Sequence, residues 1–266
     1  MQTENITTHT VQSADGTLIG YRRLGSGSPI VLVHGSISTG DQWHGVAAEL
    51  ARTNTVYVMD RRGRGLSADA EEYALGTESD DIKALLEVAG EGSALLGHSY
   101  GAICALEAVR TGASVSSLVL YEPPLPVDAP TAGAALEDYA AAVNEGDGDK
   151  AMRIAAAHFL RISPEETEGL AASPLWAGMV GLSATWTREL REIDLTDVLI
   201  QQYADLDVST LLLVGEASPT HLVGASTHLQ QRLANVTGHR MPGQSHFAHV
   251  MDPAGVAGAI QAFINR

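Results

Sequence analysis

The chain has 266 residues, of which 45% are hydrophobic and 18% charged, and its 32 acidic and 16 basic side chains give a formal net charge of −16. This composition disfavours a disordered chain, and no basic run exceeds Arg61-Arg62, which argues against binding to nucleic acid or an anionic membrane. The single cysteine, Cys104, excludes an intrachain disulfide and a cysteine-based metal site. No apolar run approaches the roughly 20 residues that cross a bilayer, and the polar N-terminus shows no secretory signal. We therefore expect a globular cytoplasmic protein.

In chain order, the first predicted elements are two strands joined by the Asp15-Gly16 turn, followed by an alternation of buried strands and helices. Continuous apolar runs separated by helices are typical of a parallel sheet that is covered on both faces. The predicted strands lie at 7–13, 18–24, 29–35, 55–60, 93–99, 115–122, 209–215 and 236–243, and the predicted helices of this part lie at 41–50, 78–90, 100–110, 221–234 and 253–266.

The alternation is interrupted between residues 125 and 207, where the sequence contains helix signals and no convincing strand. Ser163-Pro164 with Glu166 combines a helix cap, a first-turn proline and a capping-box glutamate. Ser173-Pro174 is predicted to open another helix, with Met179 and Trp186 among its inward-facing residues. We predict a core of residues 1–124 and 208–266 with a helical cap inserted at 125–207.

The segment Gly97-His98-Ser99-Tyr100-Gly101 matches the pattern G-x-S-x-G between a predicted strand and a predicted helix. In this context the serine lies in a strained turn that exposes its hydroxyl at the carboxyl end of the sheet. The pattern also occurs by chance in ordinary strand–helix turns. His34-Gly35-Ser36 follows an earlier strand, where a loop can donate a backbone N–H to an oxyanion. The predicted oxyanion donors are therefore the amides of Ser36 and Tyr100.

Two further segments contain charged or ionisable residues near strand ends. Asp60–Ser67 is charged and glycine-rich but lacks the pattern of a phosphate-binding loop, so we interpret it as structural. "GQSHFAHVMDP" contains His246 and His249 between the last strand and the last helix. A base for a serine nucleophile is expected there, and His246 is favoured because it lies nearer the strand end.

The chain resembles an α/β-hydrolase. "VLVHGS", "MDRRGRGLS", "LLGHSYGA", "LVLYEPP", "LLLVGE" and "GQSHFAHVMDP" occur in that family's order and cover the chain outside the insertion. The resemblance implies a mostly parallel, doubly wound sheet with the insertion as the family's variable cap. It also implies a nucleophile, an acid and a histidine in that chain order, without a metal or an organic cofactor.

The acid departs from the family's common pattern. In most relatives it lies three residues beyond the glycine of "LLLVG", where this chain has Ser218. Glu216 is nearby, at a position that is usually not catalytic. Glu122 follows the strand after the nucleophile helix, and some relatives, including certain lipases and lactonases of the zearalenone-hydrolase type, place the acid there. We predict that a carboxylate oxygen of Glu122, rather than of Glu216, lies within hydrogen-bonding distance of His246.

The resulting hypothesis is a hydrolase of a small, largely apolar carboxylic ester or lactone. Ser99 would attack the carbonyl, His246 would accept its proton, and Glu122 would hold the imidazole. The cap residues Trp176, Met179 and Trp186 are candidates either for substrate contact or for packing of the cap. Two alternatives remain on the same fold, namely a hydrolase of a carbon–carbon bond in a vinylogous diketone and a non-catalytic ligand-binding protein or receptor.

Overall fold

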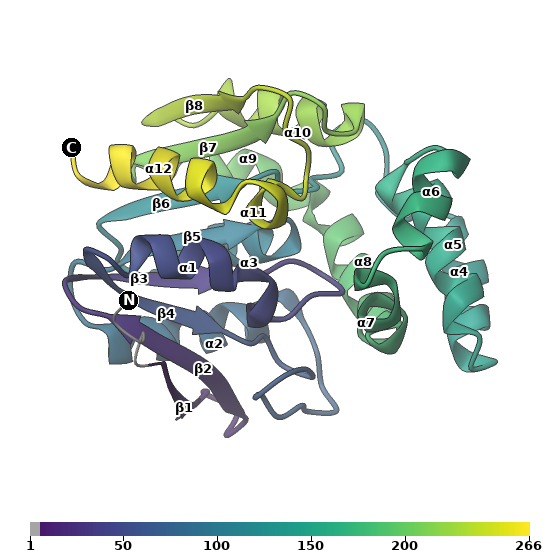
Figure 1. Ribbon diagram of the computed structural model, residues 1–266, viewed down its shortest axis with the longest axis horizontal. Helices are drawn as coiled ribbons and strands as arrows, with labels where there is room; N and C mark the ends of the chain where they lie inside the picture. Colours follow the sequence, from purple (N-terminus) through teal and green to yellow (C-terminus); the bar gives the residue numbers. More distant parts are fainter. Residues whose placement is uncertain (1–5) are drawn as a thin grey trace.

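The computed structural model describes residues 6–266, which contain one eight-stranded sheet in the order β1-β2-β4-β3-β5-β6-β7-β8 (Figure 1). Strand β2 runs antiparallel to β1 and β4, and every other neighbouring pair is parallel. The polar N-terminal stretch that argued against a secretory signal falls partly on residues 1–5, outside the described residues. The strands are β1 (Thr7–Gln12), β2 (Leu18–Gly25), β3 (Ser28–Val33), β4 (Asn54–Met59), β5 (Ala94–His98), β6 (Ser117–Tyr121), β7 (Thr210–Gly215) and β8 (Val236–Met241).

Helices cover both faces of this sheet, which confirms the predicted α/β class. Strands β4 to β7 are buried at every residue, as their continuous apolar sequences require in a two-sided parallel sheet. Helix α12 packs with α1 on one face of the sheet, and α2 packs with α3 on the other (Figure 1). These elements are η1 (Gly40–Trp43), α1 (His44–Leu50), α2 (Leu75–Ala89), α3 (Tyr100–Arg110), α10 (Thr220–Gln230), α11 (Ala248–Met251) and α12 (Pro253–Ile264).

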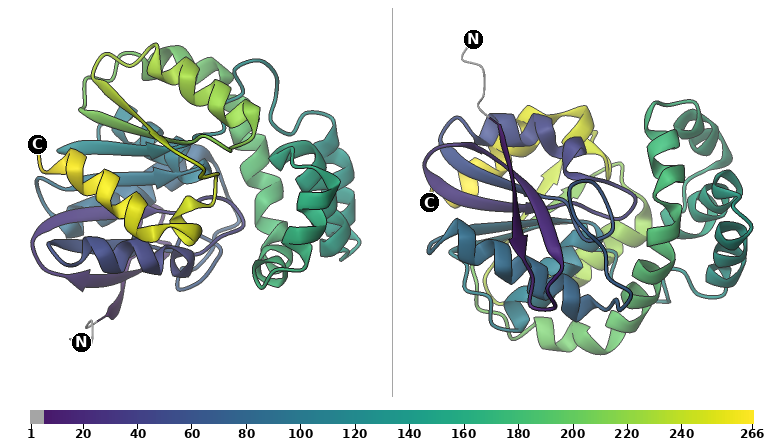
Figure 2. Two further views of the ribbon diagram at one scale, coloured as in Figure 1. Left: turned by 45° about the horizontal axis from the view of Figure 1, so that its top comes forward. Right: turned by 90° about the horizontal axis from the view of Figure 1, so that it is seen from below.

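The segment between β6 and β7 is helical and stands at the end of the sheet to which the parallel strands point (Figures 1 and 2). Ser163 caps α6 as expected, because its hydroxyl accepts from the Glu166 amide at 3.2 Å and the Glu166 carboxylate accepts from the Ser163 amide at 2.8 Å. The helices are α4 (Ala135–Asn144), α5 (Gly148–Ala155), the π-helix η2 (Ala156–Leu160), α6 (Pro164–Ala171), α7 (Leu175–Gly181), α8 (Ser183–Asp194), η3 (Leu195–Leu199) and α9 (Ile200–Tyr203).

The helix predicted to open at Ser173-Pro174 is two helices, which corrects the sequence interpretation. The first begins at Leu175 and ends at Gly181, and the second begins at Ser183. Leu182 joins them with φ −102° and ψ 2°, outside the helical range. A glycine at the end of α7 weakens the helix by about 1 kcal/mol relative to alanine, which favours a break at this point.

A buried ion cluster links the helical segment to the sheet. Arg61 contacts Glu78 of α2 at 3.2 Å and Glu189 of α8 at 2.5 Å, and Arg64 also pairs with Glu189. All four side chains are almost fully buried. The sequence interpretation of the loop Asp60–Ser67 as structural did not foresee these buried charges. Two guanidinium groups and two carboxylates balance in charge, which is the condition for holding ions away from water.

Candidate active site

Ser99 lies in a sharp turn between β5 and α3. Its backbone has φ 54° and ψ −125°, a conformation that a residue with a side chain adopts only when its surroundings impose it. Close packing explains the constraint, because a Cβ added to Gly101 would lie 2.4 Å from the carbonyl oxygen of His34. The helix that starts at Tyr100 can therefore approach the neighbouring strand directly. The turn presents the Ser99 side chain to a cavity at the carboxyl end of the sheet.

The loop after β3 lies against the same serine. A Cβ added to Gly35 would come within 2.8 Å of the Ser99 Cβ, so the glycine allows this approach. The approach brings the next residue, Ser36, to the cavity that Ser99 lines. Within the part of the chain that the structure describes, the amides of Ser36 and Tyr100 donate to no other group. Both amides are thus free donors at the positions predicted for an oxyanion hole, and the Tyr100 amide also belongs to a helix N-terminus.

Glu122 and His246 form a short hydrogen bond. The distance from His246 Nδ1 to Glu122 Oε2 is 2.6 Å, and the second carboxylate oxygen accepts from the Gly215 amide at 2.7 Å. Glu122 is fully buried and has φ 47°, a left-handed conformation that turns its side chain toward the histidine loop. Because an ionised carboxylate only accepts hydrogen bonds, this pairing places the proton of a neutral His246 on Nδ1. The other ring nitrogen is then free to act as a base.

The alternative acid lies elsewhere. Glu216 directly follows β7 and is exposed to solvent, and it forms no ion pair with a histidine of residues 6–266. Ser218, at the position common for the acid in relatives, is buried, and its hydroxyl has no partner in the described chain. The structure therefore brings Glu122, and not Glu216, within hydrogen-bonding distance of His246.

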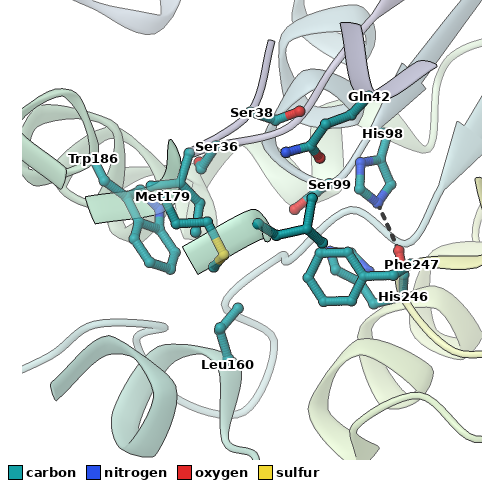
Figure 3. A pocket seen from close by; sticks show the side chains of 12 residues that line it. Ser36, Ser38, Gln42, His98, Ser99, Leu160, Met179, Trp186, His246 and Phe247 are labelled. Carbon is teal, nitrogen blue, oxygen red and sulfur yellow. Dashed lines mark hydrogen bonds between the residues drawn. The ribbon is translucent and has the colours of Figure 1, made fainter. Parts of the chain in front are cut away.

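The backbone around His246 is held from the core by two side chains. The Tyr121 hydroxyl donates to the carbonyl oxygen of Ser245 and accepts from the amide of Ala248 at 3.1 Å, so it brackets the histidine. His98 Nε2 lies 3.1 Å from the carbonyl oxygen of His246 (Figure 3). Burial, reinforced by the neighbouring histidines, holds the pKa of His98 well below its ordinary value. A neutral His98 can still donate this bond through one N–H group.

His249 has a packing position. Its ring stacks on Trp43 with a centroid distance of 4.6 Å and an interplanar angle of 10°. Neither ring nitrogen has a hydrogen-bond partner in residues 6–266. Burial, followed by the nearby His246, lowers the pKa of His249 to about 3, so the ring stays neutral. The two histidines of the loop therefore differ in partner and surroundings, and only His246 pairs with a carboxylate.

The cavity beside Ser99 has a volume of about 40 Å³ and combines polar and apolar walls. Figure 3 shows Ser36, Ser38 and Gln42 on one side of Ser99, and Leu160 and Phe247 on the other. Phe247 directly follows His246 in the sequence, and this position was the signal that could have identified it as a lining residue. No feature of the sequence identified Gln42 as a lining residue, because a position in the short helix η1 does not determine the direction of its side chain.

Two of the three predicted cap residues line this cavity and one does not. Met179 and Trp186 are among the lining residues. Trp176 is directed into the cap itself, where its indole N–H donates to Asp149 at 2.8 Å and the Arg153 guanidinium lies 5.8 Å from its ring centroid. Of the two roles expected for Trp176, its position fits packing of the cap. Its polar N–H is satisfied by a carboxylate at the outer side of the helices.

Residues 6–266 contain no group of three or more histidine, cysteine, aspartate or glutamate side chains that could hold a metal ion. None of the helices within these residues has the length and apolar character needed to cross a membrane.

Comparison with known proteins places the chain in a family. The pattern of the alpha/beta hydrolase family matches residues 30–259, which run from β3 into α12. The chain belongs to the alpha/beta hydrolase family. The match includes the turn at Ser99, Glu122 and the loop with His246. This hydrolase is therefore an enzyme of that family, as the order of its motifs indicates.

Three known proteins are similar to the hydrolase over different lengths. The solved structure of an alpha/beta hydrolase from Sphaerobacter thermophilus has a TM-score of 0.87 at 29% identity, over 96% of this chain and 99% of that chain. 2-(Acetamidomethylene)succinate hydrolase from Mesorhizobium japonicum is 25% identical over 257 residues, 93% of this chain and 91% of that protein. N-formylmaleamate deformylase from Pseudomonas putida is 40% identical over 118 residues, 42% of this chain and 44% of that protein. The chain thus matches less than half the length of the deformylase.

Proposed function

We propose that this hydrolase cleaves a small, largely apolar carboxylic ester or lactone through an acyl-enzyme on Ser99. The observation that carries the proposal is the 2.6 Å bond from His246 Nδ1 to the buried Glu122. A histidine held in this tautomer beside a serine in a strained turn is the arrangement that activates a hydroxyl nucleophile.

The proposed reaction has two steps that use the same groups. Ser99 Oγ attacks the carbonyl carbon while His246 accepts its proton, and the amides of Ser36 and Tyr100 stabilise the negative oxygen. His246 then gives the proton to the leaving oxygen, which releases the alcohol and leaves an ester on Ser99. Water, deprotonated by His246, attacks this ester, and the acid departs. Glu122 keeps the imidazole oriented and stabilises its charged form in both steps.

Amide bonds are a second bond type that this site could cleave. The names N-formylmaleamate deformylase and 2-(acetamidomethylene)succinate hydrolase refer to an N-formyl group and to an acetamido group, both of which contain an amide. An amide on the same serine would use the same oxyanion donors and the same base, with an amine as leaving group. Amides are therefore a second candidate substrate class for this site.

The test is hydrolysis of p-nitrophenyl acetate and of its amide analogue p-nitroacetanilide by the wild type and by Ser99→Ala. We expect Ser99→Ala to lose at least a thousandfold in kcat, because the covalent step disappears. Ser218→Ala is the matched control, since this serine is buried nearby but has no proposed role, and its activity should stay close to that of the wild type. Labelling of wild-type Ser99 by a fluorophosphonate provides a second readout. Equal turnover by the wild type and Ser99→Ala would contradict the proposal.

A further inference from the structure

A second cavity lies on the other side of the histidine loop. It has a volume of about 350 Å³ and shares Leu160, His246 and Phe247 with the cavity of Ser99. Its remaining walls come from the cap segment 161–170, from the loop between β7 and α10 with the first turn of α10, and from Ser245. The two cavities therefore meet at one border, and the proposed base belongs to that border.

The cavity of Ser99 is small for a whole ester. Its volume is about 40 Å³, against about 350 Å³ for the second cavity. Sites for small organic ligands usually have volumes of about 300 to 1,000 Å³. The second cavity reaches that range. An ester whose carbonyl is at Ser99 must therefore extend across the border formed by Leu160 and Phe247.

The lining of the second cavity is mainly apolar. Leu170, Leu222 and Pro219 contribute to it, together with Ala217 and the two border side chains. The carboxylate of Glu166 accepts from the Ser163 amide at 2.8 Å. The guanidinium of Arg161 donates to two backbone carbonyl oxygens at 3.3 Å. Because both charged groups are exposed and already engaged, the interior favours a hydrocarbon group.

The loop beyond β7 can form an apolar wall of the second cavity because it has no carboxylate at residue 218. Ala217 and Pro219 flank Ser218, the position that holds the aspartate in many relatives, and both face the second cavity. A carboxylate at residue 218 would put a buried charge beside this cavity. With Glu122 paired to His246 from β6 instead, the loop can present apolar side chains.

The order of groups around Ser99 indicates which part of a substrate enters. The proposed oxyanion donors are the amides of Ser36 and Tyr100, and neither residue lines the second cavity. His246 does line it, and in the proposed reaction His246 gives its proton to the leaving oxygen. The leaving group must therefore lie on the side of His246. Figure 3 shows Leu160 and Phe247 on this side of Ser99, away from Ser36.

We propose that the second cavity binds the alcohol portion of the ester, as an aliphatic or aromatic hydrocarbon group, when Leu160 and Phe247 separate. This inference rests on the proposed function and adds its substrate class. The hydrolase then selects esters by the size of the alcohol, while the acyl group remains small. Each methylene that enters the cavity increases kcat/KM about three- to fourfold until the cavity is full.

Two matched ester series test this inference. One keeps the acetyl group and lengthens the alcohol from ethyl to octyl, and the other keeps the methyl alcohol and lengthens the acid. The wild type should gain kcat/KM along the first series and not along the second. Ala217→Phe, which fills the second cavity, should remove the gain along the alcohol series. Ala262→Phe, on an exposed position of α12, is the control and should behave as the wild type.

The outcomes separate this inference from the proposed function. A gain along the acid series, or a gain with longer alcohols that persists in Ala217→Phe, would overturn the assignment of the cavity. Absence of any turnover that depends on Ser99 would contradict the proposed function instead. In that case octanol binding, followed by thermal shift, still tests the cavity directly. Binding by the wild type that Ala217→Phe lacks would support a hydrocarbon site, and equal binding by both would refute it.

Discussion

The substitution Glu122→Gln tests the atom-level consequence of the bond to His246. The Gly215 amide donates to Glu122 Oε1 at 2.7 Å, so the carbonyl oxygen of a glutamine would take that position. Its NH₂ group would then face His246 Nδ1, where the carboxylate oxygen now accepts at 2.6 Å. Two donors cannot face each other, so His246 would carry its proton on Nε2 instead. In that tautomer the imidazole cannot accept the proton of Ser99.

The expected loss can be given a magnitude. Forcing the wrong tautomer while keeping the shape of the site costs serine hydrolases about 10⁴ in kcat. At 1.36 kcal/mol for each factor of ten, this is about 5.4 kcal/mol of transition-state stabilisation. Because the glutamine keeps the Gly215 bond and the volume of the side chain, we expect the thermal midpoint to change little. The loss should therefore appear in catalysis and not in folding.

The assay is the steady-state hydrolysis of p-nitrophenyl acetate, with the rate of fluorophosphonate labelling of Ser99 as a second measure. Both rates should fall together in Glu122→Gln. Glu216→Gln is the control, because it makes the same chemical change on an exposed side chain beyond β7. Activity of Glu122→Gln within tenfold of the wild type would refute the reasoning, as would a large loss confined to Glu216→Gln.

Three other predictions concern the surroundings of the site. Tyr121→Phe removes the hydroxyl that brackets the histidine loop, so kcat should fall about tenfold with little change in KM; an unchanged kcat in steady-state assays would argue against this role. Glu189→Ala removes the carboxylate that pairs with the buried guanidinium groups of Arg61 and Arg64. We expect the free energy of unfolding in urea titrations to fall by about 3 to 5 kcal/mol, and a fall below 1 kcal/mol would contradict this prediction. The folded pKa of His249 is about 3, below the value of about 6.5 in an unfolded chain, so stability is present above pH 6.5 and is lost as the pH falls toward 3, by about 1.4 kcal/mol per pH unit. Between pH 4 and 6, His249→Phe should reduce the slope of the unfolding free energy against pH by the amount that corresponds to one proton. An identical slope in the variant would show that His249 does not cause this pH dependence.

The local sequence was sufficient to predict the fold and the contact between Glu122 and His246. An apolar strand, a serine between glycines and a helix follow one another from residue 94 to residue 110, and each is recognisable from neighbouring residues alone. Parallel strands end at one edge of a sheet, so Glu122 and the loop of His246 were expected to meet there. The absence of an aspartate at residue 218 narrowed the acid to two glutamates. These predictions succeeded because they depend on chain order and on strand direction.

Only the tertiary structure decided where individual side chains point. Glu122 faces His246 because its backbone adopts φ 47° and the Gly215 amide holds one carboxylate oxygen, and neither condition has a local sequence signal. The same reason explains why Trp186 lines the cavity while Trp176 turns to Asp149. The burial of Arg61 beneath a cap helix depends on Glu189, 128 residues later in the chain. Such choices depend on packing between distant segments, because a side chain's direction is set by the contacts and hydrogen bonds available in the folded chain.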